Sequence, residues 1–275
     1  MLESTHTSSA LVTVMPRPRI LAVVNQKGGV GKTTTTINLA TAMAAVGERV
    51  LIVDLDPQGN ASTGLGIMRA GRAVSTYQVL MGEANLSAAV MKSFVPGLDI
   101  LPATVDLSGA ELELIGVERR NFRLRDAFAG ALLPYDHVLI DCPPSLTLLT
   151  VNALAAADAV LVPLQCEFFA LEGLSQLLRT IERVRHTFNP LLEIQGVVLT
   201  MFDRRNNLSD QVAKDVRDCL GEKVYHTVIP RNVRLSEAPS HGKPALVYDH
   251  RCVGSQAYIR LAGEVIRRER ELRAA

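Results

Sequence analysis

The sequence contains no tryptophan, and aromatic residues make up only 4% of its 275 residues. Proteins that bind single-stranded nucleic acid usually stack the bases on aromatic side chains, so this composition argues against that mode of recognition. Lys and Arg number 29 against 28 Asp and Glu, which leaves a formal net charge of +1. The overall charge therefore indicates no strongly acidic or basic partner.

The sequence also lacks a long apolar run, and a membrane-spanning helix needs about 18 or more such residues. Its most apolar stretch, from Ala153 to Leu164, is interrupted by Asp158 and Pro163. The N-terminal residues have neither the basic segment nor the apolar core of a signal peptide. We therefore expect no membrane insertion and a cytoplasmic location.

Cysteine is sparse, and Cys142, Cys166, Cys219 and Cys252 lie far apart in the chain. They form no CxxC pair and no spacing typical of a zinc site. The six histidines show no metal-binding spacing either. We predict reduced thiols, most of them buried.

Short apolar runs alternate with longer amphipathic stretches along most of the chain. Residues 1–18 are rich in Ser, Thr and Pro and predict a mobile tail, which a single domain over residues 19–275 follows. The apolar runs predict buried strands over Ile20–Asn25, Val50–Asp54, Leu98–Leu101, His137–Asp141, Ala159–Pro163, Gly196–Thr200 and Val224–Ile229. The stretches between them predict helices over Lys32–Val46, Leu107–Leu132, Leu171–Phe188 and Ser209–Leu220, with a last helix over Ser255–Arg273. This alternation is typical of an α/β fold with an open, mostly parallel twisted sheet and helices on both faces.

A glycine-rich turn follows the first predicted strand directly, with the sequence Gln26-Lys27-Gly28-Gly29-Val30-Gly31-Lys32-Thr33-Thr34. Its glycines let backbone N–H groups turn toward phosphate oxygens, Lys32 can reach the terminal phosphates, and Thr33 can offer its hydroxyl to Mg²⁺. The usual pattern G-x-x-x-x-G-K-[ST] needs glycine where this chain has Gln26. A second lysine, Lys27, gives instead the K-G-G-x-G-K-[ST] form of the deviant Walker A motif, and the chain here resembles the ParA/MinD group of P-loop ATPases.

Carboxylates follow two of the predicted strands. Asp54 and Asp56 come at the end of the second strand, and Asp141 ends the apolar run from His137. Because ligands of open α/β sheets bind beyond the carboxyl ends of the strands, we expect these groups to meet the glycine-rich turn along one sheet edge. Asp56 can hold an attacking water, and Asp141 has the Walker B arrangement for Mg²⁺. The alternative is that these aspartates only cap loops.

Four segments together resemble a ParA/Soj-type chromosome-partitioning ATPase, and the likeness runs from about Ile20 to the C-terminus. The segments are 24–34 around the glycine-rich turn, 54–62 (DLDPQGNAS), 140–145 (IDCPPS) and 229–240 (IPRNVRLSEAPS). The resemblance implies an ATP-dependent sandwich dimer with the nucleotides at its interface and Mg²⁺ as the metal.

Carried over residue by residue, the resemblance implies a role for each matching side chain. Lys27 would reach across to the partner's ATP, and Lys32 would bind the phosphates in its own subunit. Thr33 would ligate Mg²⁺, Asp141 would support the metal, and Asp56 would position the attacking water. The remaining contacts to the nucleotide would come from Gly28, Gly29, Val30, Gly31 and Thr34, and from Pro230 and Asn232 near the adenine.

The resemblance also implies that the ATP-bound dimer binds double-stranded DNA without sequence preference and is released when a ParB-like centromere-binding protein stimulates hydrolysis. Arg205 and Arg234 match the family's DNA-contacting arginines. Residues 201–275 hold 14 basic and 10 acidic side chains, so the C-terminal quarter has the sign that phosphates require. The alternative is that these arginines are solvated or ion-paired. DNA binding would make the protein nucleoid-associated.

Three other interpretations share the same nucleotide motif. A MinD-like membrane-associated ATPase would need an apolar C-terminal anchor, but residues 267–275 contain one large apolar side chain, Leu272. An iron–sulfur reductase would need cysteines such as Cys142 and Cys166 to bridge a cluster, yet the ParA likeness of the turn after Asp141 already explains Cys142. A related ATPase that positions a plasmid, a flagellum or a chemotaxis cluster stays open, because its nucleotide site would be the same.

Overall fold

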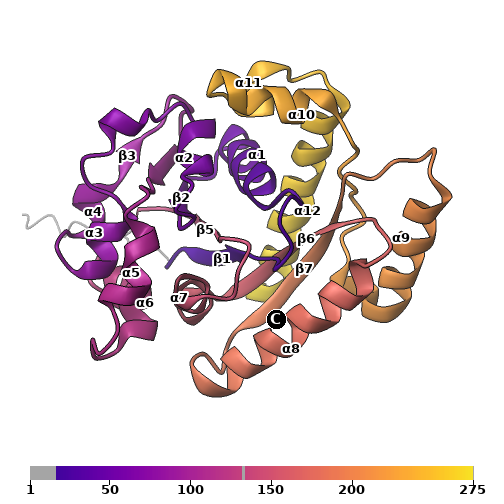
Figure 1. Ribbon diagram of the computed structural model, residues 1–275. Helices are drawn as coiled ribbons and strands as arrows, with labels where there is room; N and C mark the ends of the chain where they lie inside the picture. The colour runs from indigo at the N-terminus through magenta and orange to yellow at the C-terminus, as the bar shows by residue number, and fades with distance from the viewer. Residues whose placement is uncertain (1–16, 132–133, 275) are drawn as a thin grey trace, which may run out of the picture.

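A seven-stranded sheet lies at the centre of the protein, with helices on both of its faces (Figure 1). The computed structural model describes residues 17–131 and 134–274, so most of the predicted tail lies outside the described residues. The strand order is β3-β4-β2-β5-β1-β6-β7, and every pairing is parallel except the one between β3 and β4. The strands are β1 Arg19–Val23, β2 Val50–Asp54, β3 Met91–Lys92, β4 Leu98–Leu101, β5 His137–Asp141, β6 Ala159–Gln165 and β7 Glu193–Thr200. The prediction of an open, mostly parallel α/β sheet is confirmed.

The helices vary from single turns to a long C-terminal helix. The α-helices are α1 Lys32–Ala45, α2 Asn60–Gly64, α3 Thr76–Met81, α4 Leu86–Ala89, α5 Leu107–Glu113, α6 Arg123–Ala129, α7 Leu148–Ala156, α8 Ala170–Thr187, α9 Asn207–Leu220, α10 Val233–Glu237, α11 Ala245–Tyr248 and α12 Val253–Ala274. Short 3₁₀ turns are η1 Arg69–Gly71, η2 Arg120–Phe122, η3 Gly221–Lys223 and η4 Ala238–His241. Among the described residues, none of these helices has the length and apolar character to span a bilayer.

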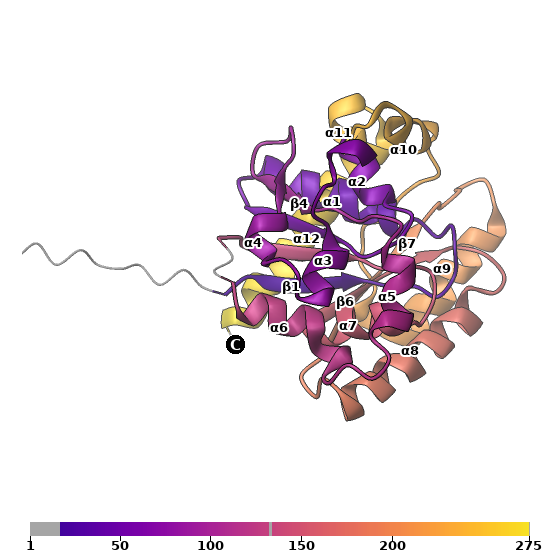
Figure 2. The same ribbon diagram turned by 60° about the vertical axis from the view of Figure 1, so that its left-hand side comes forward.

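The sheet is buried on both faces, which explains its continuous apolar strands. Along β1, Ile20 and Ala22 point into one core, and Leu21 and Val23 point into the other. Helices α6, α7 and α8 cover the first face, and α1 and α12 cover the second, as Figures 1 and 2 show from two sides. The last predicted helix is therefore a cover of the sheet that also packs against α1.

The predicted strand over Val224–Ile229 is wrong, because this segment joins β7 only at isolated positions. Val224 forms a single parallel bridge with Val197, although the segment runs beside the edge strand. Two backbone N–H groups that a strand would use, those of His226 and Thr227, donate instead to the carboxylate of Glu264 on α12, at 2.8 and 3.0 Å. The Glu264 carboxylate thus takes the place of a neighbouring strand as the acceptor for these two N–H groups.

The predicted helix over Leu107–Leu132 is also wrong as one continuous element. It is divided into α5, η2 and α6. Gly116 (φ 85°) and Arg119 (φ 58°) take left-handed backbone conformations between the two helices, and a helix cannot continue through such residues. Leu132 lies outside the described residues. The other four predicted helices are confirmed, and none of their ends differs from the prediction by more than two residues.

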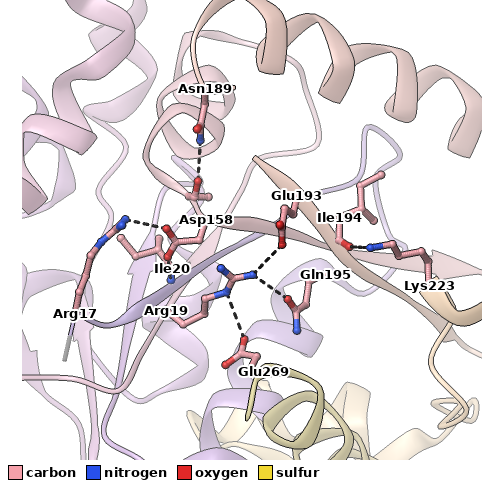
Figure 3. A network of polar contacts seen from close by, with 11 residues as sticks. Arg17, Arg19, Ile20, Asp158, Asn189, Glu193, Ile194, Gln195, Lys223 and Glu269 are labelled. Atoms are coloured by element: carbon pink, nitrogen blue, oxygen red, sulfur yellow. Dashed lines mark hydrogen bonds and ion pairs between the residues drawn. The ribbon is translucent and has the colours of Figure 1, made fainter. Parts of the chain in front are cut away.

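Charged side chains gather at the N-terminal edge of the sheet, where β1 begins (Figure 3). The guanidinium of Arg19 lies 3.5 Å from Glu193 and 3.3 Å from Gln195 on β7, and 4.0 Å from Glu269 on α12. Glu269 is buried and also lies 3.2 Å from Nδ1 of His137 at the start of β5. These contacts join α12 to the N-terminal edge and leave the opposite edge to the candidate site.

Candidate functional site

The glycine-rich turn and the two acidic strand ends meet at the C-terminal edge of the sheet. Strand β5 lies between β1 and β2, and in its register Asp141 pairs with Val23 on one side and with Asp54 on the other. The turn leaves β1 directly beyond Val23. The predicted convergence of these three segments along one edge is therefore confirmed.

The glycine-rich turn presents unused backbone donors at the start of α1. Gly29 and Gly31 have φ of 76° and 89°, a left-handed conformation that favours glycine. No backbone N–H from 28 to 34 donates a hydrogen bond to another described residue. The hydroxyl of Thr200 at the end of β7 donates to the Val30 carbonyl at 2.8 Å and fixes the turn against the sheet. Free N–H groups at a helix N-terminus form an arrangement that binds phosphate.

The two lysines of the turn have different surroundings. Lys32 is 7% exposed, and its ammonium donates to the Lys27 carbonyl at 2.9 Å. Burial lowers the pKa of Lys32, while the negative charges of Asp141 and Asp56 act in the opposite direction. Lys27 is half exposed and forms an ion pair with Glu167, in the loop between β6 and α8. Lys32 thus points into the site, and Lys27 points away along the surface.

Asp141 has the environment of a metal-supporting carboxylate. Its Oδ1 accepts a hydrogen bond from the Thr36 hydroxyl at 3.1 Å, and its buried Oδ2 has no hydrogen-bond partner among the described residues. Burial is the main cause that raises the pKa of Asp141, the charge of Asp54 adds to it, and the hydroxyls of Thr33 and Thr36 oppose it. An unpartnered carboxylate oxygen beside a threonine hydroxyl is an oxygen donor set that fits Mg²⁺.

Asp54, the last residue of β2, and Asp56, just beyond it, differ in the hydrogen bonds that they accept. Asp54 is fully buried and accepts from the hydroxyl and the N–H of Ser62, at 2.6 and 2.8 Å. Burial raises the pKa of Asp54, and the hydrogen bonds from Ser62 oppose this shift because they stabilise the charged carboxylate. Asp56 is 9% exposed; its Oδ1 accepts from the Gln58 N–H at 3.0 Å, and its Oδ2 accepts no hydrogen bond from a described residue. Asp54 therefore holds the turn, as the capping alternative expected, and Asp56 keeps one oxygen available.

Pro230 and Asn232 lie beside the glycine-rich turn, although nearly 200 residues separate them in the sequence. Together with Gly31, Thr34 and other residues, they line a cavity of about 280 Å³. The Asn232 side chain accepts from the Arg234 N–H at 3.0 Å and caps α10, so its position is fixed. The cavity therefore borders the turn at Gly31 and Thr34.

The arginines predicted to contact DNA are exposed and ion-paired. Arg205, in the loop after β7, lies 2.9 Å from Asp203, and Arg234 on α10 lies 2.8 Å from Glu237 and 3.6 Å from Asp249. The ion-paired alternative is therefore what the structure contains. Exposed ion pairs contribute little free energy, about 0 to 1 kcal/mol, so a phosphate group can replace these carboxylates.

Sequence reasoning missed a group of basic side chains next to Arg205. Arg204, Arg231 and Arg260 line with it a cavity of about 740 Å³. Within the part of the chain that the structure describes, these three guanidinium groups form no ion pair and no side-chain hydrogen bond. They come from three separate segments, and only the charge excess of the C-terminal quarter pointed to them.

Three polar residues that support the turn were also missed. Asn25 accepts from the Lys27 N–H at 3.0 Å and donates to the Pro163 carbonyl at 2.8 Å. Thr200 and Glu167, described above, contact Val30 and Lys27. Thr200 ends β7 and Glu167 follows the end of β6, so both lie at the same sheet edge, which the sequence pattern indicated without revealing the contacts. The two thiols considered as cluster ligands, Cys142 and Cys166, are buried, but Cys219 is exposed and Cys252 is partly exposed, so the prediction that most thiols are buried is wrong.

Comparisons with known proteins agree with this geometry. A family described as "AAA domain" matches residues 18–194. The chromosome partitioning protein ParA of Caulobacter vibrioides is 68% identical over 258 residues, which cover 93% of this chain and 97% of that protein. The sporulation initiation inhibitor protein Soj of Bacillus subtilis is 53% identical over 247 residues, which cover 90% and 98%. Cobyrinic acid a,c-diamide synthase from Mycobacterium smegmatis, crystallised with ADP and magnesium, is 40% identical, with a TM-score of 0.81 and coverage of 92% and 96%.

Proposed function

This chain belongs to the ParA/Soj family of chromosome-partitioning P-loop ATPases, and on that basis we propose that it is a Mg-ATPase whose ATP-bound dimer binds DNA during chromosome segregation. The observation that carries the proposal is the convergence of Lys32, Asp56 and Asp141 on one sheet edge beside free backbone donors. The 68% identity with a ParA protein supports the biological role. We treat residues 19–275 as one ATPase domain.

The nucleotide is held at two ends. The phosphates bind to the free N–H groups of the glycine-rich turn and to Lys32, whose ammonium exchanges the Lys27 carbonyl for a phosphate oxygen. The adenine enters the cavity lined by Pro230 and Asn232. The Thr33 hydroxyl and the Asp141 carboxylate would hold Mg²⁺, and the bound ion would neutralise phosphate charge.

Asp56 positions the water that attacks the terminal phosphate. Its Oδ2 accepts no hydrogen bond from a described residue, and its Oδ1 is fixed by the Gln58 N–H. A carboxylate held in this way can accept a hydrogen bond from water and keep it aligned with the phosphorus, which lowers the entropic part of the barrier. Hydrolysis is slow unless a partner completes the site.

Dimerisation and DNA binding depend on exposed cations. Lys27, on the surface beside the turn, reaches the ATP of a second copy. Arg205 and Arg234 exchange their carboxylate partners for phosphates of double-stranded DNA, without reading its sequence. Because the dimer doubles the number of these contacts, it binds DNA at salt concentrations where a monomer does not.

Hydrolysis separates the dimer and ends DNA binding. A ParB-like centromere-binding protein stimulates this step and thereby sets where on the nucleoid the protein is released. The protein accordingly acts in the cytoplasm, on nucleoid DNA, and inserts no segment into a membrane.

The test is binding of a duplex by the Asp56→Ala protein with ATP, with ADP and without nucleotide, at two salt concentrations. We expect strong binding with ATP alone, weakened by salt and equal for unrelated DNA sequences. Demonstrated ATP binding without DNA binding in any state would contradict the proposal and favour an ATPase that positions cargo on another surface.

A further inference from the structure

The backbone of Lys27 is fixed at two points, while its side chain is half exposed. Its N–H donates to Asn25 Oδ1 at 3.0 Å, and its carbonyl accepts from Lys32 Nζ at 2.9 Å. Asn25 is itself buried and bonded to the carbonyl of Pro163 on β6 at 2.8 Å. When Lys32 exchanges the Lys27 carbonyl for a phosphate, the contact with Asn25 still holds the Lys27 backbone, so a change of partner at Lys27 is chiefly a movement of its side chain.

The partner of that side chain is Glu167. The ammonium of Lys27 contacts its carboxylate, and neither side chain forms another ion pair with a described residue. Lys27 is 50% exposed and Glu167 28%, so water screens the pair only in part. The Glu167 carbonyl accepts from the Ala170 N–H at 3.0 Å, which fixes this loop at the start of α8. The carboxylate is thus presented to Lys27 from an ordered turn.

The same loop carries two exposed aromatic side chains. Phe168 and Phe169 are 75% and 61% exposed, and their rings meet edge to face with centroids 5.1 Å apart. A second copy that approaches Lys27 also meets this loop, since Glu167 precedes the two rings directly. The aromatic side chains that such a copy would contact are therefore next to the carboxylate that binds Lys27.

We propose that the ion pair between Lys27 and Glu167 is an inhibitory contact that opposes dimerisation. Glu167 keeps the ammonium of Lys27 in its own subunit until the phosphates of an ATP bound to a second copy compete for it. This inference rests on the proposed function, because it assigns a regulator to the same site. ATP competes better than ADP, since its additional phosphate carries more negative charge toward the ammonium.

The size of the effect follows from the exposure of the pair. An ion pair of this kind changes an equilibrium by a factor of about two to five. The dimer breaks two such pairs, one in each subunit. Removing the carboxylate should therefore lower the dissociation constant of the ATP-bound dimer by about four- to twenty-five-fold.

The first experiment measures that dissociation constant by sedimentation velocity, with Mg²⁺ and a non-hydrolysable ATP analogue. It compares the parent, Glu167→Gln, and the matched control Glu172→Gln. The exposed carboxylate of Glu172 on α8 accepts from Gln176 at 3.4 Å and forms no ion pair with a described residue. We expect tighter dimers for Glu167→Gln and no change for the control. Equal or weaker dimerisation of Glu167→Gln than of the parent overturns the inference, whereas absence of dimers in all three proteins overturns the proposed function.

A second experiment tests the ion pair without nucleotide. Amine acetylation, followed residue by residue with mass spectrometry, should label Lys27 about two to five times faster in Glu167→Gln than in the parent. The exposed Lys214 on α9 serves as an internal reference with an unchanged rate. Equal labelling of Lys27 in both proteins would mean that the pair does not form in solution, and the inference would fail independently of ATP binding.

Discussion

The ammonium of Lys32 lies 2.9 Å from the carbonyl oxygen of Lys27, inside the turn that we assign to phosphate. The two lysines of the motif are thus joined through the backbone, with Lys32 buried and Lys27 half exposed. A phosphate that takes Lys32 as its partner frees the Lys27 carbonyl. Nucleotide binding therefore changes the surroundings of both lysines together.

Lys32→Ala should weaken ATP binding by about ten- to hundredfold, because it removes a charged hydrogen-bond donor from a shielded site. The measurement is a titration with a fluorescent ATP analogue. Lys214→Ala, on the exposed face of α9, is the control and should bind as the parent does. If Lys32→Ala bound the ATP analogue as tightly as the parent, Lys32 would not contact the phosphates.

Asp56→Ala should leave ATP affinity within about twofold and slow hydrolysis by about hundredfold, because the side chain orients water and does not hold the phosphates. Phosphate release under single-turnover conditions measures the chemical step. If the variant hydrolysed ATP at the parental rate, the oxygen that Asp56 keeps available would have no part in hydrolysis.

Arg234→Glu should weaken DNA binding and lower the slope of log affinity against log salt by about two, since a dimer loses two phosphate contacts. Arg185→Glu is a matched control, because Arg185 on α8 also forms an exposed i,i+3 ion pair at 2.8 Å. Fluorescence anisotropy with a labelled duplex gives both slopes. Equal slopes for the two variants would mean that Arg234 contacts no phosphate and that the DNA-binding surface does not include α10.

Gly196→Ala should destabilise the fold by about 1–3 kcal/mol, because β7 packs closely there. A Cβ at this position would lie 2.6 Å from the Tyr225 ring and 2.9 Å from the Lys223 carbonyl. Gly173→Ala on α8 meets nothing within 4 Å and should be neutral or stabilising. Urea denaturation of the two variants would show the difference; equal midpoints would mean that Tyr225 moves aside without cost.

Local sequence was sufficient for the elements with continuous apolar character and for the turn between β1 and α1. The glycines at 29 and 31 specify a backbone that few other residues adopt, and the apolar runs of β1, β2 and β5 specify buried parallel strands. Local sequence did not predict the structure where a residue far along the chain competes for backbone hydrogen bonds. The segment after Val224 has strand-like composition, but Glu264 on α12 accepts hydrogen bonds from two of its N–H groups, those of His226 and Thr227.

The reactive groups of this protein can be read from neighbouring residues: the phosphate-binding turn with two lysines, and the carboxylates at the strand ends. The partner of each charged side chain, in contrast, depends on the folded arrangement. Glu167 is 140 residues from Lys27, and Arg204, Arg231 and Arg260 come from three segments that meet at one cavity. The reason is physical, because backbone conformation follows from neighbours in the chain, whereas electrostatic contacts form between side chains that only folding brings together.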